Sequence, residues 1–433
     1  MIIIDKALEN LEKKDRPIRV GLIGFGFAGQ GFAMQLLEGI PGMRLVAISN
    51  RTYKNLEKGL KLLKVKSYKT TNSQKQLDQL IKNKTLAITS DFKLLTNSKN
   101  IDVIVEATGE VEFGAQVAMA CFKNEQSSAS RKKHLVLINA ELDATLGPIL
   151  KNYADKAGVI FTQGDGDQPA VLMRIYRQVK QMGFKPVMVG NIKSLIDPRR
   201  TPKTQAAFAK AHWQRPKMIT SFADGSKIAF EMATIANATG FPVAKRGMIG
   251  PRTQRVEDAV NLFDKKMLLK TGLTDYILGA EPSFGVFVIA YSKNPIKRRY
   301  MQVYKMGKGP FYTFYTHCHL SPIEAPLSVA QAVLFKDPSL SPIAGPVCEV
   351  ITLAKKDLKK GEVLDGIGGF AVYGALENSN IARKENLLPM GLADGCILKR
   401  DIKMDTALTF DDVELPEKRI SDKLWKEQIK IFA

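Results

Sequence analysis

"GLIGFGFAGQGFAMQLLEGIPGMRLVAISNRT", residues Gly21 to Thr52, is the stretch that decides the fold of this chain. It opens on an apolar, β-branched run, passes through three glycines and continues with apolar residues at helical spacing up to Pro41-Gly42. A second apolar run follows at residues 44–48. This order of strand, turn, helix and strand predicts a β-α-β unit in a parallel sheet.

The glycines fit the pattern G-x-G-x-x-G. In that pattern the first glycine makes a tight turn, the second lets a diphosphate approach the backbone, and the third allows close packing of helix on strand. The N-terminus of the helix adds free N–H groups and partial positive charge. We therefore predict dinucleotide binding, through the residues of the turn: Gly24, Gly26, Phe27, Ala28 and Gly29.

The second strand ends in Ser49, Asn50, Arg51 and Thr52, where an NAD-binding protein usually has Asp or Glu. A carboxylate there would repel a 2′-phosphate, whereas hydroxyl and amide donors beside a guanidinium suit one. These four residues predict NADP(H), so NADPH is the expected cofactor. The alternative is that Arg51 only caps a solvated loop.

Further apolar runs at 86–89, 101–105 and 135–138 alternate with helical patterns, as in a doubly wound α/β sheet of Rossmann type. Helices are expected at 5–14, 112–122 and 145–156, and residues 57–98 are expected to cover one edge. Because ligands lie at the carboxyl ends of parallel strands, Thr108, Gly109, Asn139 and Glu141 are predicted to line the nicotinamide end. Glu106 and Glu141 fit equally well as acids at helix N-termini.

The periodicity changes twice along the chain, which predicts three domains. Residues 1–157 form the NADP-binding domain. Residues 158–345 form a second, α+β catalytic and dimerisation domain, with strands at 186–189, 285–291 and 300–304 and a helix at 226–238. Residues 346–433 have short runs punctuated by glycine and form a small β-rich domain.

The net charge of +21 reflects 46 lysines against 18 arginines, spread through every segment. Since basic residues are not interleaved with aromatic ones, solvated lysines explain most of this charge, and we expect no nucleic-acid partner. The rest of the positive charge favours the binding of anionic substrates. No apolar stretch is long enough to span a membrane, so we expect no membrane partner and a cytoplasmic location.

The four cysteines, Cys121, Cys318, Cys348 and Cys396, lack zinc-site spacing and are expected to be buried free thiols. His317 and His319 alternate as in a strand, but no third ligand is spaced nearby, which argues against a metal site. The cysteines and histidines therefore predict neither a metal site nor a set of disulfide bonds.

Three clusters in the second domain carry candidate chemistry. The first is "GDGDQPA" (164–170). The second contains Lys193 and Asp197, followed by Arg199, Arg200 and Lys203, which suit a phosphate or carboxylate or else form a solvated loop. In the third, Lys227 and Glu231 lie four apart on a predicted helix that is apolar on most sides, with Asn237 further along. Such pairs are often solvated ion pairs, but a charged pair on a buried helix indicates a cleft.

Taken together, "VGLIGFGFAGQG", "VAISNRT", "VIVEATG", "INAELDATLGPIL", "GDGDQP" and "ADGSKIAFEMATIANATG" resemble, over nearly the whole chain, the homoserine-dehydrogenase-related oxidoreductases with a C-terminal SAF domain. Within that group the chain is most similar to the deoxyxylulose-phosphate-reductoisomerase-like family. Its terminal motifs "KKDLKKGEVL" and "ALTFDDVEL" look like the SAF part. The metal-binding motif of ordinary deoxyxylulose-phosphate reductoisomerases is absent, so their catalytic residues are not carried over.

The resemblance implies an NADPH-dependent reductoisomerase that converts 1-deoxy-D-xylulose 5-phosphate to 2-C-methyl-D-erythritol 4-phosphate for isoprenoid synthesis. A divalent metal, Mg²⁺ or Mn²⁺, commonly assists that reaction. The partner would be a phosphorylated sugar, and we expect a homodimer. The alternatives are a dehydrogenase of homoserine, a sugar acid or a polyol, and a non-catalytic NADP(H)-binding regulator.

For this chemistry we assign Lys193 and Lys227 to hold oxyanion charge, and Glu231 or Asp197 to transfer protons. Arg199 and Arg200 would grip the phosphate. Lys203 and Asn237 complete the expected substrate site.

Overall fold

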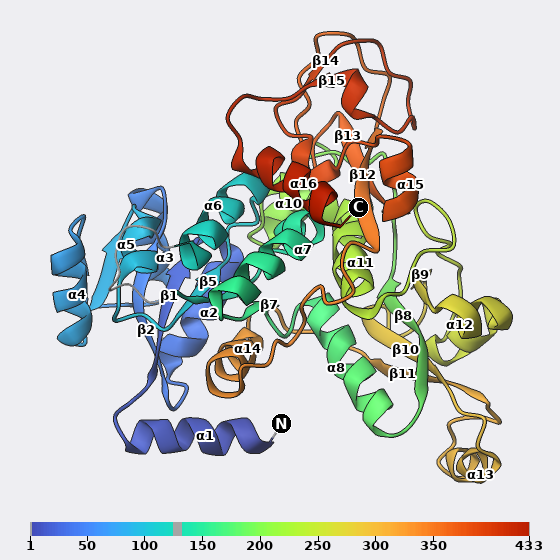
Figure 1. The fold of residues 1–433 in the computed structure, drawn as a ribbon, viewed down its shortest axis with the longest axis horizontal. Coiled ribbons are helices and arrows are strands. Elements are labelled where there is room, and N and C mark those ends of the chain that lie inside the picture. Colours follow the sequence, from blue (N-terminus) through green and yellow to red (C-terminus); the bar gives the residue numbers. More distant parts are fainter. Residues whose placement is uncertain (1, 124–131, 433) are drawn as a thin grey trace.

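The computed structural model describes residues 2–123 and 132–432, and its first layer is a parallel seven-stranded sheet in the order β3-β4-β2-β1-β5-β6-β7 (Figure 1). The strands are β1 (Ile18–Ile23), β2 (Met43–Ser49), β3 (Tyr68–Thr70), β4 (Leu86–Thr89), β5 (Val103–Glu106), β6 (His134–Leu137) and β7 (Phe161–Gln163). The predicted doubly wound α/β fold is confirmed. The sheet includes β7, which follows residue 157, where we expected the first domain to end. The three-domain division stays a prediction.

Helices cover both faces of this sheet. One core lies under α4 (Gln74–Lys82), α5 (Phe92–Asn97), α6 (Val111–Phe122), α7 (Ala140–Ala157) and α16 (Ile420–Ile431). The other lies under α1 (Ile2–Lys13), α2 (Phe27–Glu38), α3 (Tyr53–Leu62) and α14 (Ala325–Ala330), which continues into a π-helical turn, η2 (Gln331–Phe335). Residues 57–98 do form one edge of the sheet, as expected.

A second, mixed sheet has the order β11-β10-β8-β9. Its strands are β8 (Lys185–Lys193), β9 (Leu273–Leu278), β10 (Gly285–Tyr291) and β11 (Phe311–Thr316). Helices α8 (Gln168–Gln181) and α11 (Ser226–Thr239) pack on one face, and η1 (Val256–Asn261) and α12 (Lys265–Thr271) pack on the other. Two short helices, α9 (Ala206–Ala211) and α10 (Pro216–Ala223), precede α11.

The strand expected at 300–304 is wrong, because those residues lie in and just after α13 (Pro295–Val303). Asn294 caps this helix by accepting hydrogen bonds from the N–H groups of Ile296 (2.9 Å) and Lys297 (3.2 Å), and Pro295 occupies the first turn. These start signals outweigh the short apolar run that suggested a strand.

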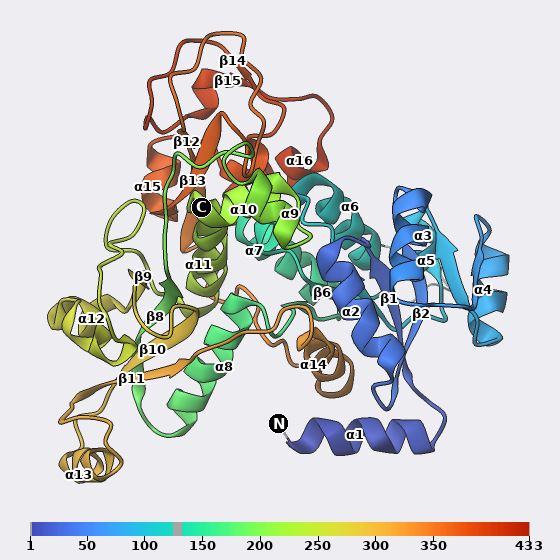
Figure 2. The ribbon, with the colours of Figure 1, turned by 180° about the vertical axis from the view of Figure 1, so that it is seen from behind.

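The last part of the chain forms small antiparallel sheets. They pair β12 (Cys348–Ala354) with β13 (Val372–Asn378) and β14 (Ile397–Leu398) with β15 (Val413–Glu414), beside α15 (Ser379–Lys384), η3 (Met390–Leu392) and η4 (Phe410–Asp412). The chain then returns to the first sheet as α16 (Figures 1 and 2). None of the described helices combines the length and apolarity needed to cross a bilayer.

One buried side chain ties α16 to α7. Gln428 accepts a hydrogen bond from the N–H of Ile149 (3.1 Å) and donates to the carbonyl of Thr145 (3.2 Å). Pro148 lies inside α7 and has no N–H of its own, so this stretch of helix needs outside partners. The C-terminal helix therefore completes a helix of the first sheet.

A second buried contact joins the β12-β13 sheet, called the terminal sheet below, to the residues just before α11. The ammonium of Lys355 donates to Asp224 (2.8 Å) and to the carbonyls of Arg200 (2.9 Å) and Gly369 (2.8 Å). The exposed fractions of the Lys355 and Asp224 side chains are 2% and 0%. Burial raises the pKa of Asp224, and Lys355 counteracts that rise.

We expect Lys355→Met to lower the free energy of unfolding by about 3–5 kcal/mol, because it leaves the Asp224 carboxyl buried without its cation. Lys356→Met is the matched control, since the side chain of Lys356 is 55% exposed and should contribute under about 1 kcal/mol. Urea unfolding at neutral pH measures both. Equal losses for the two variants would contradict the assigned role of Lys355.

Candidate active site

The glycine turn between β1 and α2 has the geometry that a diphosphate requires. Gly24 has a φ of 94°, and a Cβ there would lie 2.8 Å from the carbonyl of Ala107. A Cβ on Gly29 would lie 2.1 Å from the carbonyl oxygen of Gly24, so only glycine fits. A Cβ on Gly26 would have no atom within 4 Å. The turn therefore leaves open space at the N-terminus of α2, and the residues present fit a dinucleotide.

The four residues from the end of β2 onward, 49–52, divide into two pairs. Ser49 is buried, and its carbonyl accepts a hydrogen bond from the N–H of Gly24 (2.9 Å). Asn50 accepts from the N–H of Phe25 (3.1 Å) and donates to the carbonyl of Thr52 (2.9 Å). The carbonyl of Ser49 and the side chain of Asn50 hold the turn in shape, whereas Arg51 and Thr52 are exposed. Within the described residues, Arg51 makes no ion pair.

Polar side chains are hydrogen-bonded to one another at the carboxyl ends of β5 and β6. Glu106 is fully buried and accepts hydrogen bonds from the N–H of Thr108 (2.8 Å) and the amide of Asn139 (2.7 Å). Burial raises the pKa of Glu106 to about 7, against these hydrogen bonds. Asn139 also caps α7 by accepting from the N–H of Leu142 (3.0 Å). Glu106 thus lies in β5 rather than at a helix N-terminus.

Glu141, in the first turn of α7, accepts a hydrogen bond from Lys227 of α11 (2.9 Å). The exposed fractions of the two side chains are 3% and 11%. Burial alone would lower the pKa of Lys227, but the carboxylates of Glu141, Asp167 and Glu231 outweigh it and raise the pKa above its usual range. Lys227 therefore stays an ammonium, and this pair links the first sheet to the second.

Glu231, one turn further along α11, lies beside Lys193 at the end of β8, with 3.6 Å between Nζ and Oε2. Asn191 donates to the same carboxylate oxygen (3.4 Å). Burial raises the pKa of Glu231 to about 7, with Lys193 and Lys227 acting against the rise and Asp167 and Glu141 adding to it. Glu231 thus exchanges a proton near neutral pH.

A chain of hydrogen bonds holds Lys193 in place. Its ammonium donates to Oε1 of Gln168 (3.0 Å), and Nε2 of Gln168 lies 2.8 Å from Nε2 of His319. Nδ1 of His319 lies 3.1 Å from the carbonyl of Gly166, to which it must donate, so Nε2 accepts from Gln168. Burial lowers the pKa of His319 to about 4, and the ring of Phe284 stacks on it at 4.3 Å. The imidazole is therefore neutral.

The structure brings together three of the predicted catalytic residues: Lys193, Lys227 and Glu231. The alternative, a solvated i,i+4 ion pair on α11, is not found, because Lys227 pairs with Glu141 and Glu231 with Lys193. The predicted site residues did not include Gln168, which lies within the cluster 164–170, or Asn191, which lies two residues before Lys193. His319 was considered only as a metal ligand, and it follows β11 rather than alternating within a strand.

The remaining predicted residues lie elsewhere. Asp197 pairs with Arg200 (2.9 Å), and Arg199 pairs with Asp405 of the terminal segment. Lys203 is exposed. The carboxylates of Asp405 and Asp197 thus engage the two arginines within the chain, and the phosphate site stays a prediction.

Asn237 lies nearly three turns beyond Lys227 on α11. Its side-chain oxygen accepts hydrogen bonds from the N–H groups of Val347 (2.8 Å) and Cys348 (2.9 Å). The residue thus positions the start of β12, and this accounts for its burial without a substrate. In the described part of the chain no cluster of three or more His, Cys, Asp or Glu side chains is arranged to hold a metal ion.

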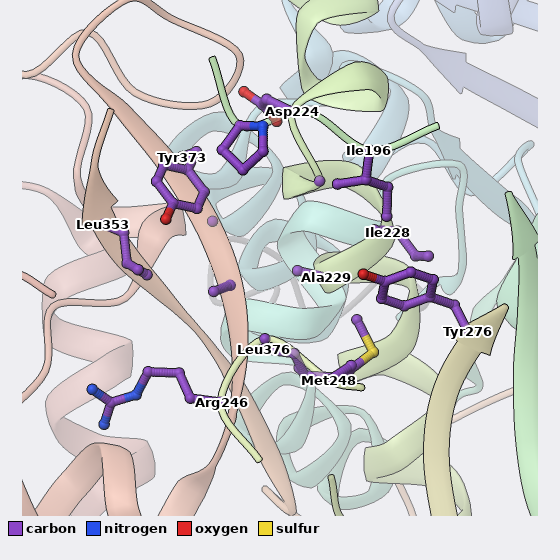
Figure 3. Close-up of a pocket in the computed structure, with 15 residues that line it drawn as sticks. Ile196, Asp224, Ile228, Ala229, Arg246, Met248, Tyr276, Leu353, Tyr373 and Leu376 are labelled. Atoms are coloured by element: carbon purple, nitrogen blue, oxygen red, sulfur yellow. The ribbon is translucent and has the colours of Figure 1, made fainter. Parts of the chain in front are cut away.

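A cavity of about 260 Å³ lies on another face of α11 (Figure 3). It separates Gly225, Ile228 and Ala229 from the terminal sheet, and Tyr276 and Tyr373 also line it. Lys227 and Glu231 do not line it. Helix α11 therefore faces the polar cluster on one side and the terminal segment on another.

Residues 166–325 match the family model described as "Oxidoreductase DRL, catalytic domain". This segment contains Lys193, Lys227, Glu231 and His319. The central part of the chain is thus similar to an oxidoreductase catalytic domain, in agreement with the class that the sequence motifs predicted. A search of curated proteins found no match.

Solved structures resemble the chain more distantly. They include a probable dehydrogenase from Thermotoga maritima (15% identity, 75% of this chain and 91% of that chain, TM-score 0.42). A scyllo-inositol dehydrogenase from Lactobacillus casei has 15% identity over 69% of this chain and 75% of that one, with a TM-score of 0.39. A putative NADPH-dependent oxidoreductase from Desulfitobacterium hafniense has 12% identity over 76% and 91%, with a TM-score of 0.36.

Two glycine substitutions separate binding from folding. Gly26→Ala places a Cβ in the open space of the turn, so it should weaken NADPH binding by at least about tenfold while leaving the unfolding temperature unchanged. Gly29→Ala should lower the unfolding temperature, because its Cβ collides with the Gly24 carbonyl. Calorimetric titration and thermal unfolding measure the two effects. Unchanged NADPH affinity in Gly26→Ala would exclude the turn as the diphosphate site.

Proposed function

We propose that the chain is an NAD(P)(H)-dependent dehydrogenase that interconverts a hydroxyl and a carbonyl group of a small polar substrate. The observation that carries the proposal is the buried cluster of Lys193, Lys227 and Glu231 beside Glu141, at the carboxyl edge of a sheet with a dinucleotide turn. Ligands of such sheets lie at that edge. The match of residues 166–325 to an oxidoreductase catalytic domain supports the reaction class.

The bound nicotinamide would donate or accept the hydride. Lys227, held as an ammonium by Glu141, stabilises negative charge on the substrate oxygen. Glu231 gives that oxygen its proton in reduction and takes it in oxidation, since its pKa is about 7. Lys193, positioned by Gln168, keeps a second cation beside Glu231.

We infer the substrate class from the polar groups of the cluster that could still bind a substrate. Oδ1 of Asn191 is buried and, among the described residues, has no hydrogen-bond partner, so it suits a substrate hydroxyl. The two ammonium groups suit a carboxylate or further hydroxyls. We therefore favour a polyol, a sugar acid or a hydroxy amino acid such as homoserine over a phosphorylated ketose, because Arg199 and Arg200 are engaged by Asp405 and Asp197.

The test is turnover with each cofactor, followed by nicotinamide absorbance. Polyols, sugar acids and homoserine are assayed in one set, and 1-deoxyxylulose 5-phosphate with Mg²⁺ or Mn²⁺ in another. Turnover in the first set supports the dehydrogenase. NADPH oxidation only with the phosphorylated ketose would replace it by the reductoisomerase. If no substrate reacts while NADPH binds tightly, the non-catalytic regulator becomes the better explanation.

For the cofactor we propose NADP(H) rather than NAD(H), on the exposed and unpaired Arg51 after β2. We expect Arg51→Asp to raise the KM for NADPH by about tenfold or more and to change that for NADH far less, because only NADPH carries the 2′-phosphate. Lys54→Asp is the control, since Lys54 is another exposed cation, the second residue of α3. Equal effects of Arg51→Asp on both cofactors would remove the assignment.

The proton-transfer role of Glu231 predicts a pH profile. Carbonyl reduction needs the protonated form, so kcat/KM should fall as the pH rises through about 7, and oxidation should show the opposite trend. Glu231→Gln should remove this inflection and lower kcat by about 10²–10⁴-fold. Asp197→Asn is the control and should keep the inflection, because Asp197 lies outside the cluster. If both variants lose the inflection, Glu231 is not the proton-transfer group.

A further inference from the structure

Asp143 of α7 and Gln163 of β7 form a buried contact that leaves one oxygen of each side chain without a partner. Nε2 of Gln163 donates to Oδ2 of Asp143 (3.0 Å) and to the carbonyl of Asn139 (3.2 Å). Oδ1 of Asp143 and Oε1 of Gln163 are buried and, among the described residues, have no hydrogen-bond partner. Because buried polar atoms of folded proteins are almost always paired, these two oxygens need an explanation.

No cation in the described chain compensates the carboxyl group of Asp143. Only burial and the hydrogen bond from Gln163 act on its pKa, and burial raises that pKa to about 7. The residue is 1% exposed. Near Oδ1 lie Gly147 and Pro342: a Cβ on Gly147 would be 2.0 Å from Oδ1 and 3.3 Å from Cγ of Pro342. A charged carboxylate in such surroundings is strongly disfavoured.

The charged side chains of the elements packed against α7 are engaged elsewhere or exposed. Lys227 of α11 pairs with Glu141, and Glu231 lies beside Lys193. The others follow the same pattern: Glu112 of α6 accepts from Ser421, His134 of β6 lies beside Lys336, Glu349 of β12 pairs with Arg383, Asp422 of α16 pairs with Arg419, Glu427 of α16 accepts from Tyr153, and Lys423, Lys426 and Lys430 of α16 are exposed. None of them supplies a charge to Asp143.

A proton on Oδ1 of Asp143 would satisfy both unpaired oxygens at once. A carboxylic acid and an amide can form a cyclic pair, in which the amide N–H donates to one acid oxygen and the acid O–H donates to the amide oxygen. The first of these hydrogen bonds is present, from Nε2 of Gln163 to Oδ2. The second would join the two unpaired oxygens, and a carboxylate cannot form it because it has only acceptors.

We infer that Asp143 keeps its proton in the folded protein and donates it in a hydrogen bond to Oε1 of Gln163. The acid–amide pair fastens the first turn of α7 to β7, next to Asn139, which caps the helix, and two residues beyond Glu141. Since only the neutral acid makes both hydrogen bonds, the contact weakens when the carboxyl loses its proton. The fold therefore contains a pH-sensitive link beside the ion pair that joins the two sheets. This inference does not depend on the function proposed above.

The link changes stability with pH in one direction. The pKa of Asp143 is about 7 in the folded protein, against an ordinary value of 3.8. Between these values the folded chain holds a proton that the unfolded chain has released. The stability that this proton contributes is fully present below about pH 4 and is lost as the pH rises through about 7.

The direct test is infrared difference spectroscopy of the full chain at mildly acid pH, wild type minus Asp143→Asn. The difference should contain the carbonyl stretch of a protonated carboxylic acid and no carboxylate band. The asparagine has the same shape, and its amide can keep both hydrogen bonds to Gln163, so the variant should stay folded, as thermal unfolding will show. In Gln163→Leu the acid band should move to higher frequency, because the acid loses its hydrogen-bond partner.

Urea unfolding from about pH 5 to pH 7 is the second measurement. The unfolding equilibrium constant of the wild type should rise about tenfold more per pH unit than that of Asp143→Asn, because the wild type releases one more proton. Asp155→Asn is the matched control on the same helix and should keep the wild-type slope, since the side chain of Asp155 is 61% exposed beside Lys151.

A carboxylate band in place of the acid band would overturn the inference, and so would equal slopes for the wild type and Asp143→Asn. If Gln163→Leu leaves the acid band unmoved, Asp143 does not donate to Gln163, and the acid–amide pair is wrong.

Discussion

The buried ion pair between Lys227 and Glu141 is the interaction on which the site depends. Glu141 begins α7 at the edge of the first sheet, and Lys227 begins α11 against the second, so the pair fixes the distance between the two sheets. A buried pair of this kind is costly to break, because either partner left alone is an uncompensated charge. One contact between two helix N-terminal turns therefore links the elements that carry the site.

Burial, together with the charges around this pair, explains why the pKa of the neighbouring Glu231 is raised to about 7. Two ammonium groups, Lys193 and Lys227, meet three carboxyl groups, Asp167, Glu141 and Glu231. With all three ionised, the cluster carries one excess negative charge in a place that water scarcely reaches. Burial raises the pKa of Glu231 to about 7, and protonating this carboxyl removes that excess. A group that exchanges its proton at this pH is what hydride chemistry at a carbonyl needs.

Helix α11 joins the active-site cluster to the terminal segment. One face presents Lys227 and Glu231, and another lines the 260 Å³ cavity against the terminal sheet. Just before the helix, Asp224 is buried against Lys355 of that segment. The return of the chain as α16, with Gln428 bridging the backbone of α7, supports the other helix of the ion pair in the same way. The terminal segment thus supports α7 and α11, the two helices that form the ion pair of the site.

Most local elements and the glycine turn could be predicted from the sequence, although not α13, because they follow from periodicity and from the conformations that only glycine adopts. The sequence also singled out Lys193, from a cluster of charged residues, and Lys227 with Glu231, since a charged pair on an apolar helix needs a reason. It could not determine pairing between segments: Lys227 meets Glu141 across 86 residues, and Arg199 is drawn to Asp405 across 206. Nor did it predict Gln168 and His319, whose roles arise only when loops far apart in the chain meet. Spacing describes neighbours along one element, whereas an ion pair or hydrogen bond between elements depends on how the sheets pack, and only the tertiary structure decides that.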